Sequence, residues 1–447
     1  MYSPVSLKII DIKGLFGSFN YHIEFPQDKD YLILTSPNGY GKTTILNIIS
    51  AIQKTDLFYF LTIPFEQISL SYSSDVDIII KSSYAAVNKN LPNDELSDSN
   101  DSLTDAAITQ GNENEITKSG ELSFSIQSPL GNASFELKDS IIRKAIRRIG
   151  FYRRLDLQDF DIHSKSYLDF LGEHQKALLS TIAKDTGGVS FLVYLEMLQN
   201  VKAIESQRLF VKSEDKNWKF RIEDVSSELK RLLEDNQKKY LITSQQKDAL
   251  FINNVLNAKQ SITEAKYNEI KKHLQKKIYN LKEHALITDI EIPDFSAEHA
   301  AMLGCYILDL KDKLEVFNDI LQKINLFMTL VKEKHFTRKR IEVSLDGGLR
   351  VRSVSDDSFI DLRNLSSGEQ NELILLYDLI FGLGNDCMLL IDEPEISLHV
   401  SWQLRFMNEL KSIARLKNLK VIVATHSPQI INDDWNNCFD LYAASRK

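Results

Sequence analysis

The sequence predicts an α/β fold: a mainly parallel sheet flanked by helices, plus an antiparallel edge sheet, interrupted by an all-helical insertion with a short coiled-coil arm. Three observations lead to this prediction. Strand-like and helical patterns alternate near both ends of the 447-residue chain. A long middle stretch has almost only helical periodicity. Two apolar strand patterns, at residues 31–35 and 387–391, run directly into a glycine-containing turn and into paired carboxylates, and the alternation of strands and helices around them implies a mainly parallel sheet covered by helices.

The first segment, residues 1–160, contains several strand patterns. The stretch Tyr31–Thr35 is apolar and leads through a glycine-containing turn into a helical pattern at Thr43–Ile52. Residues 93–119 are rich in Asp, Glu, Asn, Ser and Thr, so we expect a mobile acidic loop over about residues 88–120, because such a composition buries too little apolar surface to offset its ordering entropy. A plain solvated loop is favoured over an electrostatic decoy or a partner contact. The other predicted strands are Leu7–Ile12, Tyr21–Phe25, Val76–Lys81, Leu122–Gln127 and Ala133–Leu137.

The middle segment, residues 161–336, is expected to be the helical insertion. Within it, Ile222–Ile287 is rich in Lys, Glu, Gln and Leu and lacks proline, and its apolar residues follow mixed three- and four-residue spacings. This pattern favours an antiparallel helical pair or a short coiled-coil arm, and a packed lid of ordinary helices remains open. A further helix, Glu298–Lys334, is expected to return the chain to the first domain.

The last segment, residues 337–447, resumes the alternation of strands and helices. It opens with two strands around Asp346-Gly347-Gly348, a strong hairpin turn. The α/β domain is therefore predicted to be split, with one half before the insertion and one half after it. The remaining predicted elements are a helix at Ser367–Phe381, a strand at Cys387–Ile391, a helix at Val400–Arg415, a strand at Lys420–Ala424 and a short strand near Phe439–Ala443.

Composition excludes several classes of protein. Hydrophobic residues make up 43% and charged residues 26%, as in ordinary globular proteins, and no run approaches the roughly 18 apolar residues of a membrane span. The N-terminal residues lack the pattern of a secretion signal. The three cysteines are far apart, which fits a reduced, cytoplasmic chain and argues against a structural zinc site. A net charge of −8 means that any nucleic-acid contact would be a local patch.

The first chemical motif is a phosphate-binding loop between the strand at residues 31–35 and the following helix. In Ser36-Pro37-Asn38-Gly39-Tyr40-Gly41-Lys42-Thr43, backbone N–H groups would surround phosphates. Lys42 would reach the β and γ phosphates of ATP, and the Thr43 hydroxyl would bind Mg²⁺. Ser36 stands where the usual pattern has its first glycine, so the backbone there must tolerate a side chain. The predicted nucleotide-binding residues of this loop are Asn38, Gly39, Tyr40, Gly41, Lys42, Thr43 and Thr44.

The second motif is the apolar strand ending in Asp392-Glu393. Asp392 would enter the Mg²⁺ shell, and Glu393 would orient or deprotonate the attacking water. The alternative is a core strand that ends in an acidic turn. His426, in Thr425-His426-Ser427-Pro428 after another strand, is predicted to touch the γ phosphate, although a histidine at a strand end is often structural. The predicted catalytic residues are thus Glu393 and His426, and the predicted metal ligands are Thr43 and Asp392.

The third motif, Leu365-Ser366-Ser367-Gly368-Glu369-Gln370, opens a helix after a polar turn. Ser366 is a good N-cap by itself. A serine hydroxyl, a glycine backbone and a helix N-terminus together also form a site for a γ phosphate. Because this segment lies just before the strand of the paired carboxylates, we predict nucleotide contacts from Ser366, Ser367, Gly368 and Glu369.

In this order, these motifs resemble the ABC ATPase superfamily, and more narrowly its SMC, RecF and OLD-like branch. The resemblance covers residues 1–160 and 336–447. It implies that the signature at residues 365–370 of one subunit closes on ATP held by the phosphate loop of another, so that ATP links head-to-head dimers. It also implies that Ser397 and His399 lie near the dimer seam. The family glutamine that binds Mg²⁺ matches either Gln127 or Gln158.

A narrower resemblance is to the ATPases of two-component anti-phage systems, first the PARIS family (AriA) and second the Septu family (PtuA). It implies a homo-oligomer that senses a phage trigger protein, in PARIS a DNA mimic, and that holds and releases a separate nuclease of Toprim type (AriB-like) or HNH type. The other reading is a RecF-like, DNA-binding ATPase of repair or maintenance; direct DNA binding is less favoured, and no membrane partner is expected. Two basic runs are candidate receptors, each of which is as well explained by a solvated helix face: Arg143, Lys144, Arg147, Arg148, Arg153 and Arg154, and Lys332, Lys334, Arg338, Lys339 and Arg340.

Overall fold

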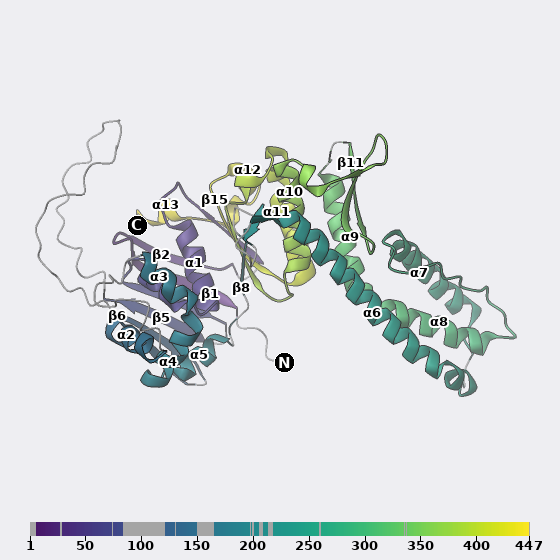
Figure 1. The fold of residues 1–447 in the computed structure, drawn as a ribbon, viewed down its shortest axis with the longest axis horizontal. Coiled ribbons are helices and arrows are strands. Elements are labelled where there is room, and N and C mark those ends of the chain that lie inside the picture. Colours follow the sequence, from purple (N-terminus) through teal and green to yellow (C-terminus); the bar gives the residue numbers. More distant parts are fainter. Residues whose placement is uncertain are drawn as a thin grey trace, which may run out of the picture. The chain divides into compact units, whose positions relative to one another are not determined.

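The structure, a computed structural model, describes residues 6–446 apart from 27–28, 74, 84–120, 130, 150–164, 197, 199–200, 205–208, 213–217, 259–260, 335 and 337. The predicted acidic loop, Gln158, Arg153 and Arg154 therefore lie outside the described residues. The chain forms two compact units (Figure 1). The first unit comprises Met1–Ile204, Asn385–Glu393 and Ala414–Lys447, and the second comprises Glu205–Gly384 and Pro394–Ile413.

A five-stranded parallel sheet forms the centre of the first unit. Its three central strands are largely apolar, buried runs, as expected for strands covered on both faces. The strands are in register: Ile33 pairs with Val423, Val423 with Ile391, and Ile391 with Ile204. Their carboxyl ends therefore meet at one edge of the sheet. The spatial order is β16 (Cys438–Asp440), β3 (Tyr31–Thr35), β15 (Lys420–Thr425), β14 (Met388–Asp392) and β8 (Val201–Ile204).

A six-stranded antiparallel sheet is the second layer of this unit. Its strands alternate buried and exposed residues, so one face is apolar. The spatial order is β2 (Phe19–Glu24), β1 (Leu7–Leu15), β4 (Gln67–Tyr72), β5 (Val76–Ser82), β6 (Glu121–Gln127) and β7 (Ala133–Lys138).

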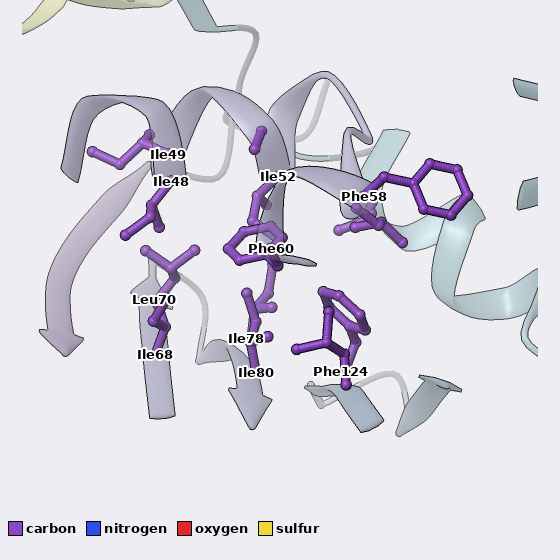
Figure 2. Packing of buried hydrophobic residues seen from close by; sticks show 14 of the residues in the cluster. Ile48, Ile49, Ile52, Phe58, Phe60, Ile68, Leu70, Ile78, Ile80 and Phe124 are labelled. Atoms are coloured by element: carbon purple, nitrogen blue, oxygen red, sulfur yellow. The ribbon is translucent and has the colours of Figure 1, made fainter. Parts of the chain in front are cut away.

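Helix α1 (Lys42–Gln53) joins the two layers. It contacts β8, β14 and β15 of the parallel sheet. Through Ile48 and Ile52 it also packs over Leu70 and Ile78 of the antiparallel sheet (Figure 2). Burial of this helix anchors the loop that precedes it, because Lys42 is the first helical residue.

Shorter helices complete the first unit. Helices α2, α4 and α5 all contact β7, the last strand of the antiparallel sheet. The helices are η1 (Leu57–Leu61), α2 (Asp139–Arg148), α3 (Lys165–Glu173), α4 (Gln175–Thr186), α5 (Val189–Glu196), α12 (Pro428–Ile431), η7 (Trp435–Asn437) and α13 (Leu441–Ala444).

The second unit carries the helical arm, formed by α6 (Arg221–Leu256), α7 (Glu264–Glu283) and α8 (Ala300–Glu315) (Figure 1). Helices α6 and α8 run antiparallel, because Lys247 bonds Asp312 whereas Tyr240, earlier on α6, packs at 5.2 Å on Phe317, after α8. The expected return helix at 298–334 is broken into α8 and α9 (Asn318–Glu333). The arm is thus a packed three-helix structure, and a coiled-coil character stays a prediction.

The rest of the second unit contains the predicted hairpin and the signature helix. The hairpin turn at Asp346-Gly347-Gly348 is confirmed, with Ser344 paired to Gly348. Gly348 has a φ of +63°, and a Cβ there would lie 2.0 Å from the Ser226 carbonyl oxygen, so glycine is required. The elements are β9 (Phe210–Lys212), β10 (Trp218–Phe220), β11 (Lys339–Ser344), β12 (Gly348–Ser353), β13 (Phe359–Ile360), η4 (Leu362–Asn364), α10 (Ser367–Tyr377), η5 (Asp378–Gly382), η6 (Pro394–Ser397) and α11 (Val400–Lys417), whose last residues, from Ala414, belong to the first unit.

Two expectations need correction. The insertion is not all-helical, because β8, β9 and β10 lie inside residues 161–336. Strand β8 pairs with β14, so the first unit extends to Ile204 and not to residue 160, and the signature belongs to the second unit. Strands of three or four residues are too short to show the alternation of apolar and polar residues that identifies a strand. Pattern analysis therefore missed them among the neighbouring helices. Among the described residues, no helix is long and apolar enough to cross a membrane.

Candidate functional site

The loop between β3 and α1 has the backbone shape of a phosphate-binding loop. Gly39 and Gly41 have φ values of +89° and +85°, a left-handed conformation that glycine adopts without strain. A Cβ on Gly41 would also lie 3.1 Å from Leu15 Cδ2. Ser36, in contrast, has no positive φ and is buried, and its hydroxyl donates to the Pro37 carbonyl oxygen at 3.0 Å. A serine therefore fits where the usual pattern has a glycine.

Lys42 is held across this loop. Its side chain is buried, and Nζ donates to the carbonyl oxygen of Ser36 at 2.9 Å and to that of Pro37 at 3.3 Å. An ammonium group satisfied only by neutral carbonyls gains from an arriving anion, because charge-assisted hydrogen bonds are the stronger ones. This is the arrangement expected of a lysine that contacts phosphate.

Two oxygen donors meet at the carboxyl edge of the parallel sheet. Thr43 Oγ1 donates to Asp392 Oδ2 at 2.9 Å. Asp392 is the last residue of β14, and Thr43 lies in the first turn of α1. Hydroxyl and carboxylate oxygens are the hard donors that Mg²⁺ accepts through one or two carboxylates plus phosphates. The donor set therefore fits Mg²⁺, with Thr43 and Asp392 as the residues that would hold it.

Glu393 follows directly and occupies a strained backbone position. Its φ is +41°, which costs of order 1–3 kcal/mol for a residue with a side chain. The strain is held by its N–H, which donates to the Ala424 carbonyl oxygen on β15 at 2.8 Å. His426 Nδ1, after the same strand, lies 3.4 Å from Glu393 Oε1. The fold thus brings the two predicted catalytic residues together.

A pocket of about 240 Å³ opens where these groups converge. It is lined by the glycines and the lysine of the loop, by Glu393 and by Phe16. All of these residues belong to the first unit. The lining residues are Phe16, Asn38, Gly39, Gly41, Lys42, Thr43, Thr44 and Glu393.

Phe16 is a candidate site residue that the sequence reasoning missed. It lies in the turn between β1 and β2 with a φ of +54°, and the residue is 41% exposed. Its ring packs edge-on at 6.4 Å against Phe19, which packs at 5.4 Å against Tyr40 of the loop. Such a ring beside a phosphate-binding loop can stack on a nucleotide base. The two phenylalanines around Gly17, in a turn between strands, were the available signal.

The signature segment of the second unit forms a complete capping box. Ser366 Oγ accepts from the Glu369 N–H at 3.3 Å, and Glu369 Oε2 accepts from the Ser366 N–H at 2.9 Å. Lys339 Nζ also donates to both oxygens of Glu369, at 2.7 and 2.8 Å. Burial alone would raise the pKa of Glu369, but the hydrogen bonds from Lys339 and Ser366 outweigh it and lower that pKa. The start of the helix stays accessible, because Ser366 and Ser367 are exposed.

For the other residues that the family resemblance implied, the structure gives little more than their positions. His399 directly precedes α11, with its ring 6.0 Å from that of Trp402. Ser397 ends η6 in the same unit. Gln127 ends β6 and is not among the residues that line the pocket beside the phosphate loop.

Several residues of the two basic runs form ion pairs with acidic residues of the same chain. Arg148 bonds Asp185, and Arg143 Nε lies 2.7 Å from Asp139. In the second run, Lys334 is fully buried between Glu372 and Glu409, and Lys339 binds Glu369. Two lysines of the second run, Lys334 and Lys339, are therefore not part of a free basic surface, because they bind carboxylates of the interior and of the signature helix.

A protein-family comparison decides the class of this chain. The family described as "AAA ATPase domain" matches residues 7–431. The chain belongs to this family. It is an ATPase, as the motifs predicted, and its match spans both units.

Individual relatives are more distant. Protein ea59 of Escherichia phage lambda is 24% identical over 155 residues, which are 33% of this chain and 30% of that protein. The Smc head domain of Pyrococcus furiosus, solved with the C-terminal domain of ScpA, is 14% identical with a TM-score of 0.33, over 96% of this chain and 91% of that one. The SMC head domain of Thermotoga maritima is 13% identical with a TM-score of 0.30, over 95% and 91%.

Proposed function

We propose that this ATPase is an ATP-controlled switch whose two nucleotide sites are shared between the heads of a dimer. The observation that carries the proposal is the distribution of the motifs. The first unit holds a phosphate loop and Glu393 around one pocket, with Asp392 hydrogen-bonded to Thr43 of that loop. Ser366 and Ser367, in contrast, stand exposed at a helix N-terminus of the second unit. An exposed helix start with hydroxyl groups is suited to bind an anion presented by another molecule.

The chemistry assigned to the first unit is phosphoryl transfer to water. Backbone N–H groups of residues 38–43 and the ammonium group of Lys42 bind the phosphates. Mg²⁺, when bound, would neutralise charge on the β and γ phosphates. Glu393 Oε1 accepts a proton from the attacking water as the new P–O bond forms and the bond to the β-phosphate oxygen breaks. His426 Nδ1 lies 3.4 Å from Glu393 Oε1, so the histidine orients the carboxylate and donates towards the γ phosphate.

We further propose that the switch serves two-component anti-phage defence, holding a separate Toprim-type or HNH-type nuclease and releasing it on contact with a phage trigger protein. Support comes from the resemblance of the chain as a whole to the ATPases of such systems, and from a helical arm of modest length. The competing function is a RecF-like ATPase that clamps DNA between dimerised heads.

Mixed dimers test the shared site. Ser366→Arg blocks the signature, and Lys42→Ala removes phosphate binding. If the sites are shared, each variant alone is inactive, but a mixture regains activity through dimers with one intact composite site, up to about a quarter of the sites in a random mixture. A mixture with no activity above the sum of the two variants would contradict sharing, because each head would then use its own signature.

Co-purification tests the defence role. The ATPase is co-expressed with a Toprim-type or HNH-type nuclease where a neighbouring gene encodes one, and any complex is isolated with and without ATP. A stable complex that inhibits the nuclease supports the proposal. Absence of any complex, together with tight ATP-dependent binding of plain duplex DNA, would instead establish the DNA-clamping function.

A further inference from the structure

A basic groove runs along the helical arm, far in sequence from the ATPase motifs. It lies on α7, next to the end of α8 and the start of α9, and has a volume of about 720 Å³. Five lysines line it, against two glutamates, Glu269 and Glu315. The chain as a whole carries a net charge of −8, so this local excess of positive charge is opposite to the average surface. The lysines are Lys266, Lys272, Lys276, Lys277 and Lys311.

The lysines of α7 fall into two classes. Those outside the groove have acidic partners: Lys271 Nζ lies 2.7 Å from Asp294 Oδ1, and Lys282 bonds Asp289. Within the described part of the chain, the groove residues Lys266, Lys272 and Lys276 form no ion pair. The groove therefore keeps charge that the rest of the helix neutralises internally.

Lys277 lies deeper in the same groove. Its side chain is half-buried, and it donates to Asn318 Oδ1. Burial lowers the pKa of this ammonium group, and the nearby Glu315 only partly opposes that effect. A desolvated cation of this kind is stabilised when an anion binds beside it.

An exposed aromatic ring continues the line of lysines. Lys272, Lys276 and Tyr279 follow each other at spacings of four and three residues, so they share one face of α7. Both lysines are exposed, and Tyr279 is 63% exposed. A positive groove with an adjacent unpacked aromatic ring is the combination that binds single-stranded nucleic acids, in which lysines follow the phosphates and a ring stacks on a base.

We propose that this groove binds the phosphodiester backbone of a single-stranded nucleic acid, with one base stacked on Tyr279. The ring discriminates between ligands of the same charge. An acidic protein offers carboxylates but no planar base for Tyr279. A duplex keeps its bases stacked within itself, so it would contact the lysines and leave the ring unused. The inference goes beyond the proposed function and does not depend on ATP hydrolysis.

Fluorescence anisotropy with the full-length chain tests the proposal. Labelled DNA and RNA strands of about 20 nucleotides are compared with the corresponding DNA duplex and with polyglutamate, between roughly 50 and 200 mM salt. The two strand arms show which sugar is preferred. Binding by one or both strands, tighter than by duplex or polyglutamate, is the expected result.

Three variants connect binding to the groove. Lys272→Ala with Lys276→Ala should reduce the slope of log K against log salt by about 1.4, because each phosphate contact on a single strand contributes about 0.7. Tyr279→Ala should weaken strand binding roughly five- to hundredfold and leave duplex binding unchanged. The matched control, Lys282→Ala, removes a lysine from the same helix outside the groove and should bind like the wild type. Unchanged ATPase rates and melting temperatures confirm that the variants fold.

Several results would overturn the inference. One is no strand binding at about 50 mM salt, where phosphate contacts are strong. Another is equal weakening by Lys282→Ala and by the groove variants, which would indicate only a general charge effect. Duplex or polyglutamate binding that is tighter than strand binding and indifferent to Tyr279→Ala would assign the groove to a different partner.

Discussion

Thr43 Oγ1 and Asp392 Oδ2, 349 positions apart in the sequence, lie 2.9 Å apart in a hydrogen bond at the edge of the parallel sheet. The contact depends on strand register. Asp392 lies opposite Ala424, and Thr425 lies opposite Thr35, the last residue before the phosphate loop. The central strand β15 therefore sets the distance between the loop and the carboxylate, and these two oxygens are the ones that would hold a divalent cation.

Removing the negative charge of Asp392 should change the Mg²⁺ dependence of ATP hydrolysis. Asp392→Asn keeps the shape and the acceptor for Thr43 but loses the negative charge that a hard cation needs. We expect the Mg²⁺ concentration for half-maximal ATPase activity to rise at least tenfold, measured by phosphate release across a Mg²⁺ titration. Asp386→Asn, in the loop before the same strand, is the control. An unchanged Mg²⁺ dependence in Asp392→Asn would remove Asp392 from the metal site.

Glu393 should be needed for hydrolysis but not for nucleotide binding. Glu393→Gln keeps the hydrogen-bonding size of the side chain and removes the base, so turnover should fall by about 10²–10⁴-fold. The ATP-bound protein should then accumulate as a dimer, visible by sedimentation with ATP and absent with ADP. Glu395→Gln, which changes a neighbouring carboxylate in the same way, is the comparison variant. Hydrolysis at the wild-type rate in Glu393→Gln would show that the catalytic assignment is wrong.

Phe16 should contribute to nucleotide affinity and to base selection. Phe16→Ala removes the exposed ring at the pocket, and we expect KM for ATP to rise about three- to tenfold with kcat nearly unchanged, as for the loss of a contact worth about 0.5–1.5 kcal/mol. Phe16→Tyr keeps the ring and should restore the wild-type KM. Steady-state kinetics with ATP as substrate and inorganic triphosphate as inhibitor separate an effect on base binding from an effect on phosphate binding. The triphosphate has no base, so its inhibition constant should not respond to either substitution. Equal effects on both ligands would mean that Phe16 only shapes the loop.

The sequence predicted which residues of the candidate site lie together better than it predicted the strands that hold them. The loop around Lys42 and the carboxylates after β14 were predictable because each motif follows directly from a short apolar strand, and local pattern was sufficient. Strand β8 was not, because its four residues join the sheet only through pairing with β14. Lys334 and Lys339 looked like a surface charge run for a related reason: their partners Glu372, Glu409 and Glu369 are 30 or more residues away in sequence. Long-range ion pairs leave no local signal.

The buried group around Lys334 makes the stability of the second unit depend on pH. Lys334 Nζ lies 2.5 Å from Glu372 and 2.6 Å from Glu409, so one ammonium group is shared by two carboxyl groups. Burial raises the pKa of Glu409 to about 7; Lys334 opposes this and Glu372 adds to it.

Because the folded pKa lies above the unfolded value, the folded state binds this proton more tightly. The stabilising contribution is therefore complete below the unfolded pKa, and it is lost as pH rises through about 7. At most it amounts to roughly 3 kcal/mol. Urea denaturation, followed by circular dichroism, should show a free energy of unfolding that falls more between pH 5 and 8 in the wild type than in Glu409→Gln, which mimics the protonated form. Glu234→Gln, a change on α6 at a side chain that is 43% exposed, should keep the wild-type slope. If Glu409→Gln keeps that slope too, the group that binds the proton is not Glu409.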